Sequence, residues 1–448
     1  MAWVGRVLTA LHNFISRPAA QAVVRNFSWL MAERLIRLAL NLGVGFWVAR
    51  HLGPGRFGTL GYCLALVTLL GFLPALGLDA IVRRDLLRSP EKTAELLASS
   101  FLLRLAAGAV AYGAVGLLVR ERWGLEGEEP RLLAIVGLLL FQPALLLPDL
   151  WLQAHLRAQW SVTAQLGALV AGSIARAGLI YAQGSLAAFA WVAVAEMALG
   201  AIVVAIVAQH LGLRVPRAAA AMAAMRRLVA EAWPLIFANL AIVVYMKIDE
   251  VMLRRLAGPA AVGIYSAATR LSEVWYFLPV ALASSLLPAL LRAREGDARI
   301  YATRLQQYYD VSAAAAYALA VPTALAAPWL VRVAYGGAFA AAGPILAVHI
   351  WSGVFVFLGV ARGQWLVNEG LQKFYLLATL AGAVANVLLN LALIPRWGGM
   401  GAAVATVISY ALAAWVASYF HPAVRATAAM QLRALLIPLR GWRYLRRA

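Results

Sequence analysis

Apolar residues dominate about twelve stretches of the chain, and short polar or Pro/Gly-rich segments separate them. A helix needs about 20 predominantly apolar residues to cross the hydrocarbon core of a bilayer, so each stretch predicts one membrane span. The pattern predicts an all-α integral membrane protein with about twelve transmembrane helices. These spans are expected at residues 27–49, 57–80, 96–119, 131–152, 160–182, 185–208, 231–253, 261–290, 306–332, 342–367, 373–394 and 400–420.

The composition agrees with this pattern and narrows the possible chemistry. Of 448 residues, 63% are hydrophobic and 13% charged, whereas about 25% of the residues in a soluble domain are charged. The single cysteine, Cys63, excludes a disulfide framework, and the six histidines are scattered without metal-ligand spacing. Motifs of nucleotide-binding loops, zinc proteases and serine hydrolases are absent from the sequence. We therefore expect no cofactor, no resident metal and no enzyme activity.

The distribution of Lys and Arg predicts the orientation of the spans. Loops on the side of both termini hold 23 of these residues, and loops on the other side hold 9. Loops rich in Lys and Arg stay in the cytoplasm, so we expect both termini to be cytoplasmic. Most of the net charge of +20 then follows from topology and from contact with anionic membrane lipids, and it does not indicate nucleic acid.

The segments outside the spans complete a predicted domain organisation. Residues 1–25 read as a cytoplasmic amphipathic helix on the membrane surface, and residues 210–230 as a cytoplasmic linker between two lobes, 26–209 and 231–420. Residues 421–448 form a basic cytoplasmic tail, which we expect to lie on an anionic leaflet from Gln431 onward.

The two predicted lobes repeat one another. At an offset of 205 residues, four positions around a tight turn are identical, and "FLP" at 72–74 matches "FLP" at 277–279. The identical pairs are Arg50 and Arg255, Gly53 and Gly258, Pro54 and Pro259, and Gly58 and Gly263. The chain is therefore an internal duplication of six spans, which predicts two pseudo-symmetric six-helix lobes with the substrate site between them.

Three segments carry a resemblance to a known family. "WVARHLGPGRFGTLGY", "YMKIDEVMLRRLAGPAAVGIYSAATRLSEVWYFLP" and "GQWLVNEGLQKF…NVLLNLALIPRWGGMGAAVATVISY" resemble Wzx-type polysaccharide flippases of the MOP (MATE-like) superfamily. The similarity runs from about Asn26 to His421. It implies translocation of undecaprenyl-pyrophosphate-linked oligosaccharide, such as O-antigen repeat units, across the bacterial inner membrane. It also implies alternating access between MATE-like lobes and partnership with the polysaccharide biosynthesis machinery.

Several ionisable residues lie within the predicted spans, where a charge at the bilayer centre costs at least ~2.5 kcal/mol and usually faces a cavity or a partner. Guanidinium groups hold phosphate oxygens bidentately, and the resemblance supports arginines in the first and eighth helices. The alternative is structural ion pairing, Glu33 with Arg37 and Arg270 with Glu273. The predicted substrate-binding residues are Arg34, Arg37, Asn41, Asn239, Arg270 and Arg362.

The stretch "KIDE" at 247–250 suggests ion coupling. Acids in this helix couple ions in members of the wider superfamily, so the resemblance implies H⁺ or Na⁺ coupling through Lys247, Asp249 and Glu250, with Glu273 from the next helix. In the alternative interpretation Lys247 only neutralises one of the acids, and Glu250 lies near the membrane interface.

Two other classes of protein compete with a flippase as interpretations of the sequence. A MATE-like drug or cation antiporter has the same fold and prefers an acidic cavity, and the spans hold 7 basic and 8 acidic residues. A membrane-bound polymerase or ligase needs a sizeable external loop, but the longest one here, 120–130, has about ten residues. The antiporter therefore stays open as the alternative, and the enzyme is disfavoured.

Overall fold

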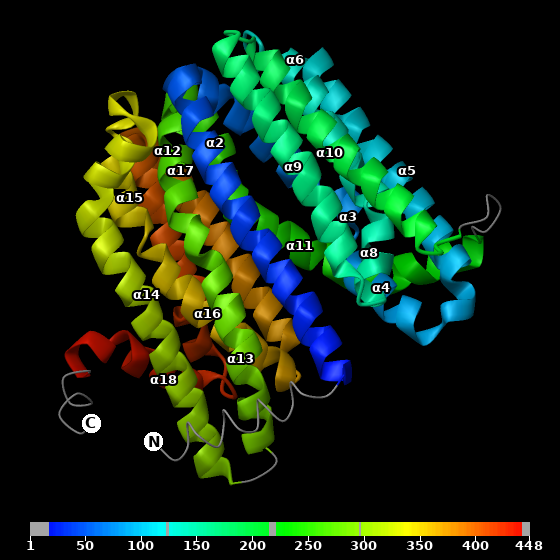
Figure 1. Ribbon diagram of the computed structural model, residues 1–448. Coiled ribbons are helices and arrows are strands. Elements are labelled where there is room, and N and C mark those ends of the chain that lie inside the picture. The colour runs from blue at the N-terminus through cyan, green and yellow to red at the C-terminus, as the bar shows by residue number, and fades with distance from the viewer. Residues whose placement is uncertain (1–17, 122–124, 215–220, 295–296, 441–448) are drawn as a thin grey trace. The chain divides into compact units, whose positions relative to one another are not determined.

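The computed structural model describes residues 18–121, 125–214, 221–294 and 297–440, and in these ranges all regular secondary structure is helical, without strands (Figure 1). Most of the predicted N-terminal amphipathic helix and the last residues of the basic tail lie outside the described residues. The elements are α2 (Pro18–Leu70), α3 (Phe72–Ala75), α4 (Leu78–Arg88), η1 (Pro90–Lys92), α5 (Thr93–Arg120), α6 (Glu129–Val136), η2 (Gly137–Phe141), α7 (Gln142–Leu145), α8 (Leu147–Ala154), α9 (Ala158–Tyr181), α10 (Leu186–His210), α11 (Met222–Ala257), α12 (Pro259–Glu273), η3 (Val274–Tyr276), α13 (Phe277–Arg294), α14 (Ala298–Tyr335), η4 (Gly337–Phe339), α15 (Ala342–His349), α16 (Ser352–Asn368), α17 (Gln372–Ala414), η5 (Val416–Phe420) and α18 (Arg425–Leu435).

Many of these helices have the length and composition of membrane spans, which confirms the predicted fold class. Within the described residues, eight helices are long and apolar enough to cross a membrane, or nine if a bent pair in α11 counts as one span. Two of the eight, at 34–88 and 372–420, have 55 and 49 residues. At 1.5 Å per residue each is roughly two and a half times as long as a bilayer core requires. The number of twelve spans stays a prediction.

The chain divides into two compact units. Unit 1 comprises Met1–Val48 and Val67–Asn239, and unit 2 comprises Ala49–Leu66 and Leu240–Ala448. The segment 49–66, which belongs to the first sequence repeat, is therefore grouped with the elements of the second. The predicted lobe boundaries differ from the units in this segment.

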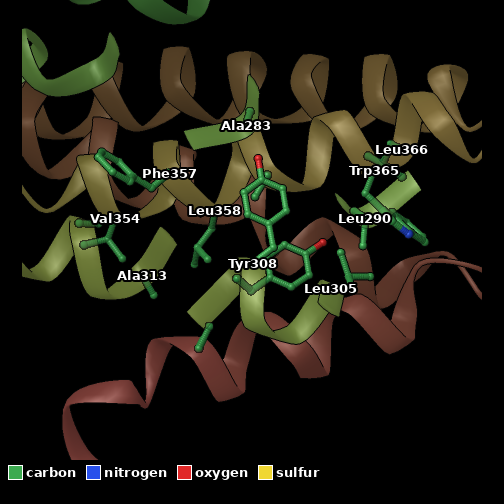
Figure 2. Packing of buried hydrophobic residues seen from close by; sticks show 14 of the residues in the cluster. Ala283, Leu290, Leu305, Tyr308, Ala313, Val354, Phe357, Leu358, Trp365 and Leu366 are labelled. Atoms are coloured by element: carbon green, nitrogen blue, oxygen red, sulfur yellow. The ribbon is translucent and has the colours of Figure 1, made fainter. Parts of the chain in front are cut away.

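Each unit has a hydrophobic core of its own. In unit 1, Leu78 and Val82 of α4 pack with Leu97 of α5, Leu152 of α8 and Leu228 of α11, and all five are buried. In unit 2, α13, α14 and α16 contribute most of the core, as Figure 2 shows for Leu290, Leu305, Tyr308, Phe357 and Leu358. Both cores consist mainly of aliphatic and aromatic side chains that a helical period brings to one face.

The repeated turn has the same backbone conformation in both halves. Gly53 has φ 69° and ψ 170°, and Gly258 has φ 85° and ψ 173°. These positive φ values favour glycine because it lacks Cβ, and the following prolines, Pro54 and Pro259, start the next helical segment, where a missing N–H costs nothing. The turn predicted by the sequence repeat is confirmed at both sites.

Part of the predicted basic tail packs against unit 2. Helix α18 contacts α14 and η5, and Gln431 is fully buried, with its Nε2 donating to the carbonyl of Ala414 at 3.1 Å. The Tyr317 hydroxyl donates to the carbonyl of Leu435 at 3.0 Å. This part of the tail packs on the unit 2 core through residues such as Ala434, and each of the two bonds supplies a donor to a carbonyl at the end of a helix.

Candidate functional site

Charged side chains from α11 and α12 meet inside unit 2. Lys247 and Glu250 lie one turn apart on α11, and Lys247 Nζ is 2.9 Å from Glu250 Oε1 and 3.9 Å from Glu273 Oε2. The hydroxyl of Ser266 donates to the other oxygen of Glu250 at 3.1 Å. Lys247 thus neutralises part of the acidic charge, as one of the two interpretations of "KIDE" expects.

Asp249 lies apart from this ion pair, in a separate hydrogen-bond network. Its side chain is buried, with 3% of its surface exposed. Oδ1 accepts a hydrogen bond from Asn390 Nδ2 at 2.6 Å, and Oδ2 accepts bonds from the hydroxyls of Tyr265 and Thr406, both at 2.7 Å. Asn390 also donates to Asn386 Oδ1 at 3.0 Å. One carboxylate therefore contacts polar groups from α12 and from both sides of the kink at Gly398 in α17.

The atoms around Asp249 suit a small monovalent cation. Carboxylate, amide carbonyl and hydroxyl oxygens are the ligands of hard cations, and transporters hold coupling ions with such groups near the middle of the membrane. Asn390 Oδ1 is buried and accepts no hydrogen bond, although a buried acceptor normally has a partner. No group of three or more His, Cys, Asp or Glu suited to a metal occurs among the described residues.

Arg270 of α12 presents its guanidinium at the surface of unit 2. Its Cζ lies 4.8 Å above the ring of Phe57, a cation–π distance, and Phe57 packs edge-on against Phe339. Among the described residues, no ion pair joins Arg270 to Glu273, although the two lie three positions apart. The pairing that the structural alternative expected for Arg270 is therefore absent from this part of the chain.

Unit 1 contains a polar pocket of about 160 Å³ between α2, α7, α9 and α10. Arg37 lines it, and its Nη2 donates to Gln165 Oε1 at 3.4 Å. Arg176 of α9 and Glu196 of α10 form an ion pair in the same pocket, with Nη1 2.7 Å from Oε2. Gln142 also lines the pocket. We refer to it below as the unit 1 pocket.

Hydrogen bonds extend from the unit 1 pocket to α4. Gln165 donates to Ser161 Oγ at 3.0 Å, and the Ser161 hydroxyl donates to Asp149 Oδ1. Gln153 donates to Asp149 Oδ2 at 3.0 Å and accepts a bond from Arg83 Nη1 at 3.2 Å. The side chain of Asp149 therefore belongs to a polar network rather than lying alone at the end of a span.

The other predicted site residues lie in different surroundings. Arg34 and Asn41 are exposed on α2, and Asn239 is half-buried on α11. Arg362 is buried, with 2% of its surface exposed, and it donates to Ser418 Oγ at 2.8 Å and to the carbonyl of Ala413 at 2.6 Å. Its guanidinium is thus engaged by the protein, and its role in substrate binding stays a prediction. The side chain of Glu33, the expected partner of Arg37, lies outside the described residues.

Several residues of these sites are not candidates from the sequence, among them Arg176, Glu196, Tyr265 and Thr406. Arg176 and Glu196 carry a signal that was available, because each is a charge within an apolar span. Tyr265 and Thr406 carry none, since a tyrosine or threonine in a span is ordinary. Only the fold brings them to Asp249, 16 and 157 positions away.

Solved structures of MOP superfamily transporters share the fold. An inward-facing MATE multidrug-resistance transporter is 18% identical with a TM-score of 0.66, covering 90% of this chain and 98% of that one. The lipid II flippase MurJ is 13% identical with a TM-score of 0.70, covering 92% and 91%. A MOP superfamily transporter from Pyrococcus furiosus is 18% identical with a TM-score of 0.62, covering 92% and 96%. At these identities the likeness shows the fold alone.

Sequence comparisons add a family. A probable flippase, AglR of Haloferax volcanii, is 31% identical over 186 residues, which make up 39% of this chain and 37% of that relative. The match therefore spans little more than a third of the relative's length. The polysaccharide biosynthesis protein family matches residues 23–294. Because that match covers more than half of the chain, the protein belongs to the polysaccharide biosynthesis protein family, and it has the fold of the MOP superfamily transporters.

Proposed function

We propose that this protein is a flippase that moves an undecaprenyl-pyrophosphate-linked oligosaccharide across the bacterial inner membrane by alternating access. The observation that carries the proposal is the placement of Arg37 on a helix long and apolar enough to span the membrane. Its side chain lines a polar pocket between helices in a member of the polysaccharide biosynthesis protein family. Arg270, exposed over the ring of Phe57, offers a second guanidinium in unit 2. Such groups suit a pyrophosphate because they stay charged and bind its oxygens in pairs.

The proposed mechanism requires no covalent chemistry. The charged headgroup enters from the cytoplasm and contacts the arginines, among which Arg34 is the exposed neighbour of Arg37 on α2. The polyprenyl chain stays in the lipid, because its transfer into a protein site would bring no gain in free energy. Movement of the lobes then exposes the headgroup on the other side. Both termini are cytoplasmic in this scheme, and the partners are the enzymes that build and polymerise the glycan.

We further propose that a monovalent cation, H⁺ or Na⁺, drives the cycle through Asp249. Three buried side chains, those of Asn390, Tyr265 and Thr406, donate hydrogen bonds to this carboxylate. Asn390 also donates to Asn386, and its own Oδ1 accepts no hydrogen bond. Lys247, Glu250 and Glu273 set the charge next to it without contacting it in the described hydrogen bonds. A cation bound here adds a positive charge to a buried carboxylate, which changes the cost of each conformation.

A MATE-like drug or cation antiporter is the second candidate. The fold likeness to MATE transporters favours it, and so does the acidic character of the α11 and α12 cluster, in which Asp249, Glu250 and Glu273 outnumber Lys247. Under this alternative the substrate is a soluble organic cation, and the arginines of α2 and α12 do not contact it.

The deciding experiment is a translocation assay in proteoliposomes. Fluorescent undecaprenyl-pyrophosphate-linked oligosaccharides of several compositions are tested with the wild type, Arg34→Ala, Arg37→Ala and Arg270→Ala. The matched control is Arg396→Ala, an exposed arginine that bonds only a carbonyl of its own helix among the described residues. We expect crossing with the wild type and the control, and at least about a tenfold loss for Arg37→Ala and Arg270→Ala, which corresponds to about 1.4 kcal/mol.

Two results would decide against the flippase. Crossing that is equally fast in every arginine variant removes the proposed headgroup site. No crossing of any oligosaccharide by the wild type, together with uptake of a soluble organic cation, identifies the antiporter instead.

A further inference from the structure

The unit 1 pocket contains an ion pair that the pyrophosphate proposal does not use. Arg176 of α9 and Glu196 of α10 face each other at 2.7 Å, and their side chains are 19% and 18% exposed. Both belong to helices with the length and composition of membrane spans. Their partial exposure is toward the pocket that they line with Arg37.

Helix packing alone does not account for this pair. Removing two charges from water is expensive, and a hydrophobic pair of similar volume is often equally or more stabilising. Charges inside spans accordingly mark ligand paths more often than they mark structure. The sequence also makes room for the carboxylate, since a Cβ on Gly172 of α9 would lie 2.3 Å from Glu196 Oε2. The position of this carboxylate therefore depends on a glycine in the facing helix.

The groups in the pocket complement the hydroxyls of a sugar. A guanidinium only donates hydrogen bonds, an ionised carboxylate only accepts them, and an amide does both. Arg176, Glu196 and the amides of Gln142 and Gln165 thus offer both halves of what a hydroxyl needs. The pocket measures about 160 Å³, close to a cavity of about 150 Å³ that holds benzene in another protein, so it takes one edge of a sugar and leaves the rest of the ring outside.

The pocket also adjoins the proposed phosphate-binding group. Arg37 Nη2 donates to Gln165 Oε1 at 3.4 Å, so one amide connects the arginine to the rest of the pocket. In a lipid-linked oligosaccharide, the first sugar is bonded directly to the pyrophosphate. We infer that the unit 1 pocket binds this first sugar through Arg176 and Glu196 and makes the protein selective for it; the inference rests on the proposed flippase function.

Binding measurements separate the sugar from the phosphate. The probes are a short-chain polyprenyl pyrophosphate without sugar and the same lipid carrying one hexose or one N-acetylhexosamine, each titrated into the purified full-length protein in detergent. We expect at least one sugar to tighten binding by about tenfold or more over the bare lipid, as hydrogen bonds to charged groups allow. This ratio is the sugar increment.

Variants of the pocket are expected to lose the sugar increment and to keep binding the bare lipid. Glu196→Gln takes away the acceptor charge, and Gly172→Ala displaces the carboxylate. The matched control is Gly167→Ala on the same helix α9, where an added Cβ meets nothing within 4 Å. We expect both pocket variants to bind the bare lipid at least as tightly as the wild type, because each removes or displaces a negative charge near the pyrophosphate, and to lose the increment, whereas the control keeps it.

A double variant guards against misfolding. Arg176→Met with Glu196→Leu replaces the pair by apolar side chains of similar size, so no unpaired charge stays in the membrane. This variant is also expected to bind bare lipid and to lose the increment. Arg37→Ala is expected to do the opposite and weaken binding of every pyrophosphate lipid.

Two outcomes overturn the inference and leave the flippase intact. The first is the absence of an increment in the wild type for every sugar tested, and the second is an unchanged increment in folded Glu196→Gln and in the double variant. A wild type that binds no pyrophosphate lipid at all instead contradicts the proposed function itself.

Discussion

Asp249 is a buried carboxylate whose two oxygens accept three hydrogen bonds from three side chains. The bonds from Asn390, Tyr265 and Thr406 measure 2.6 to 2.7 Å, and the two hydroxyl bonds have the usual O–H···O length. These donors balance the cost of burying the charge.

Replacing Asp249 by asparagine tests the coupling proposal. Asp249→Asn keeps the size of the side chain and removes its charge, and the surrounding hydroxyls can donate or accept in response. In proteoliposomes, we expect an imposed H⁺ or Na⁺ gradient to stimulate the flux of lipid-linked oligosaccharide at least about tenfold less in Asp249→Asn than in the wild type. The gradient that stimulates the wild type identifies the ion.

The control for this variant is Asp297→Asn. Asp297 is an exposed N-cap whose side chain accepts from the Arg299 N–H at 2.7 Å, so its loss affects only the end of α14 and stays within about 2 kcal/mol. Stimulation that persists in Asp249→Asn as in this control would contradict a coupling role for the carboxylate.

Arg362 tests the opposite case, a charge in a span that serves the fold. Arg362→Ala leaves the Ser418 hydroxyl and the Ala413 carbonyl without their donor and opens a cavity where the guanidinium packs near Phe374. We expect a loss of about 3 kcal/mol in the free energy of unfolding, measured by thermal unfolding in detergent. Exposed Arg396→Ala is expected to change stability by less than about 0.5 kcal/mol. Equal melting temperatures would return Arg362 to the list of candidate ligand residues.

The sequence indicated some of these residues and not others for a physical reason. Charges in spans, such as Lys247 and Arg37, stand out because they are costly in lipid. The roles of such charges cannot be inferred from the sequence, because Arg362 and Arg270 look alike in sequence and differ in burial. Hydroxyl groups such as that of Thr406 gain importance only from a partner that the fold supplies.

At the scale of elements, the repeated turn brings two helical segments of unit 2 into backbone contact. A Cβ on Gly58 would lie 1.8 Å from the carbonyl oxygen of Pro259, and a Cβ on Gly263 would lie 2.1 Å from that of Pro54. The four residues are equivalent pairs in the sequence repeat. Small residues allow such close approach between membrane helices, so the glycines are repeated because the crossing uses both.

Alanine at this crossing tests the contact. Gly58→Ala and Gly263→Ala each place a methyl group against a backbone carbonyl, which cannot turn aside as a side chain does. We expect each to lower the free energy of unfolding by about 1–3 kcal/mol and to slow translocation, and the double variant to lose less than the sum because both act on one crossing.

Gly55→Ala is the matched control for the crossing. It lies in the same helical segment with nothing within 4 Å of an added Cβ, and alanine favours helix over glycine. Its melting temperature is expected to equal or exceed that of the wild type. If Gly58→Ala has the same melting temperature as Gly55→Ala, the two segments do not pack this closely in the membrane.

Hydrophobic periodicity predicts where the helices lie, but it does not predict where a helix is interrupted. Segment 306–332 is part of one continuous helix, α14, despite Pro322 and Pro328, because membrane helices tolerate proline where neighbouring groups satisfy the freed carbonyls. Segment 261–290 instead contains the short 3₁₀ turn η3 between α12 and α13. Apolar residues fill both kinds of segment, so hydropathy cannot distinguish them.

At the scale of the whole molecule, fold and family follow from the sequence more directly than the substrate does. Apolar blocks and the repeat predict an all-helical membrane transporter, and the fold of MATE transporters and MurJ agrees with this. Those proteins share the fold at 13 to 18% identity, so the architecture tolerates nearly complete replacement of side chains. We propose that the substrate depends on a few side chains, Arg176 and Glu196 among them.

The orientation of the chain is the last prediction, and it rests on charge alone. Loops on the side of the termini hold 23 Lys and Arg residues against 9 on the other, and this bias keeps the richer side in the cytoplasm. In a Cys63→Ala background, single cysteines at Arg396 and at Lys92 should report opposite sides. We expect a membrane-impermeant maleimide to label Arg396→Cys in intact cells and to label Lys92→Cys only after the membrane is opened. The reverse pattern would place both termini outside and would send the headgroup through the protein in the direction opposite to the one proposed.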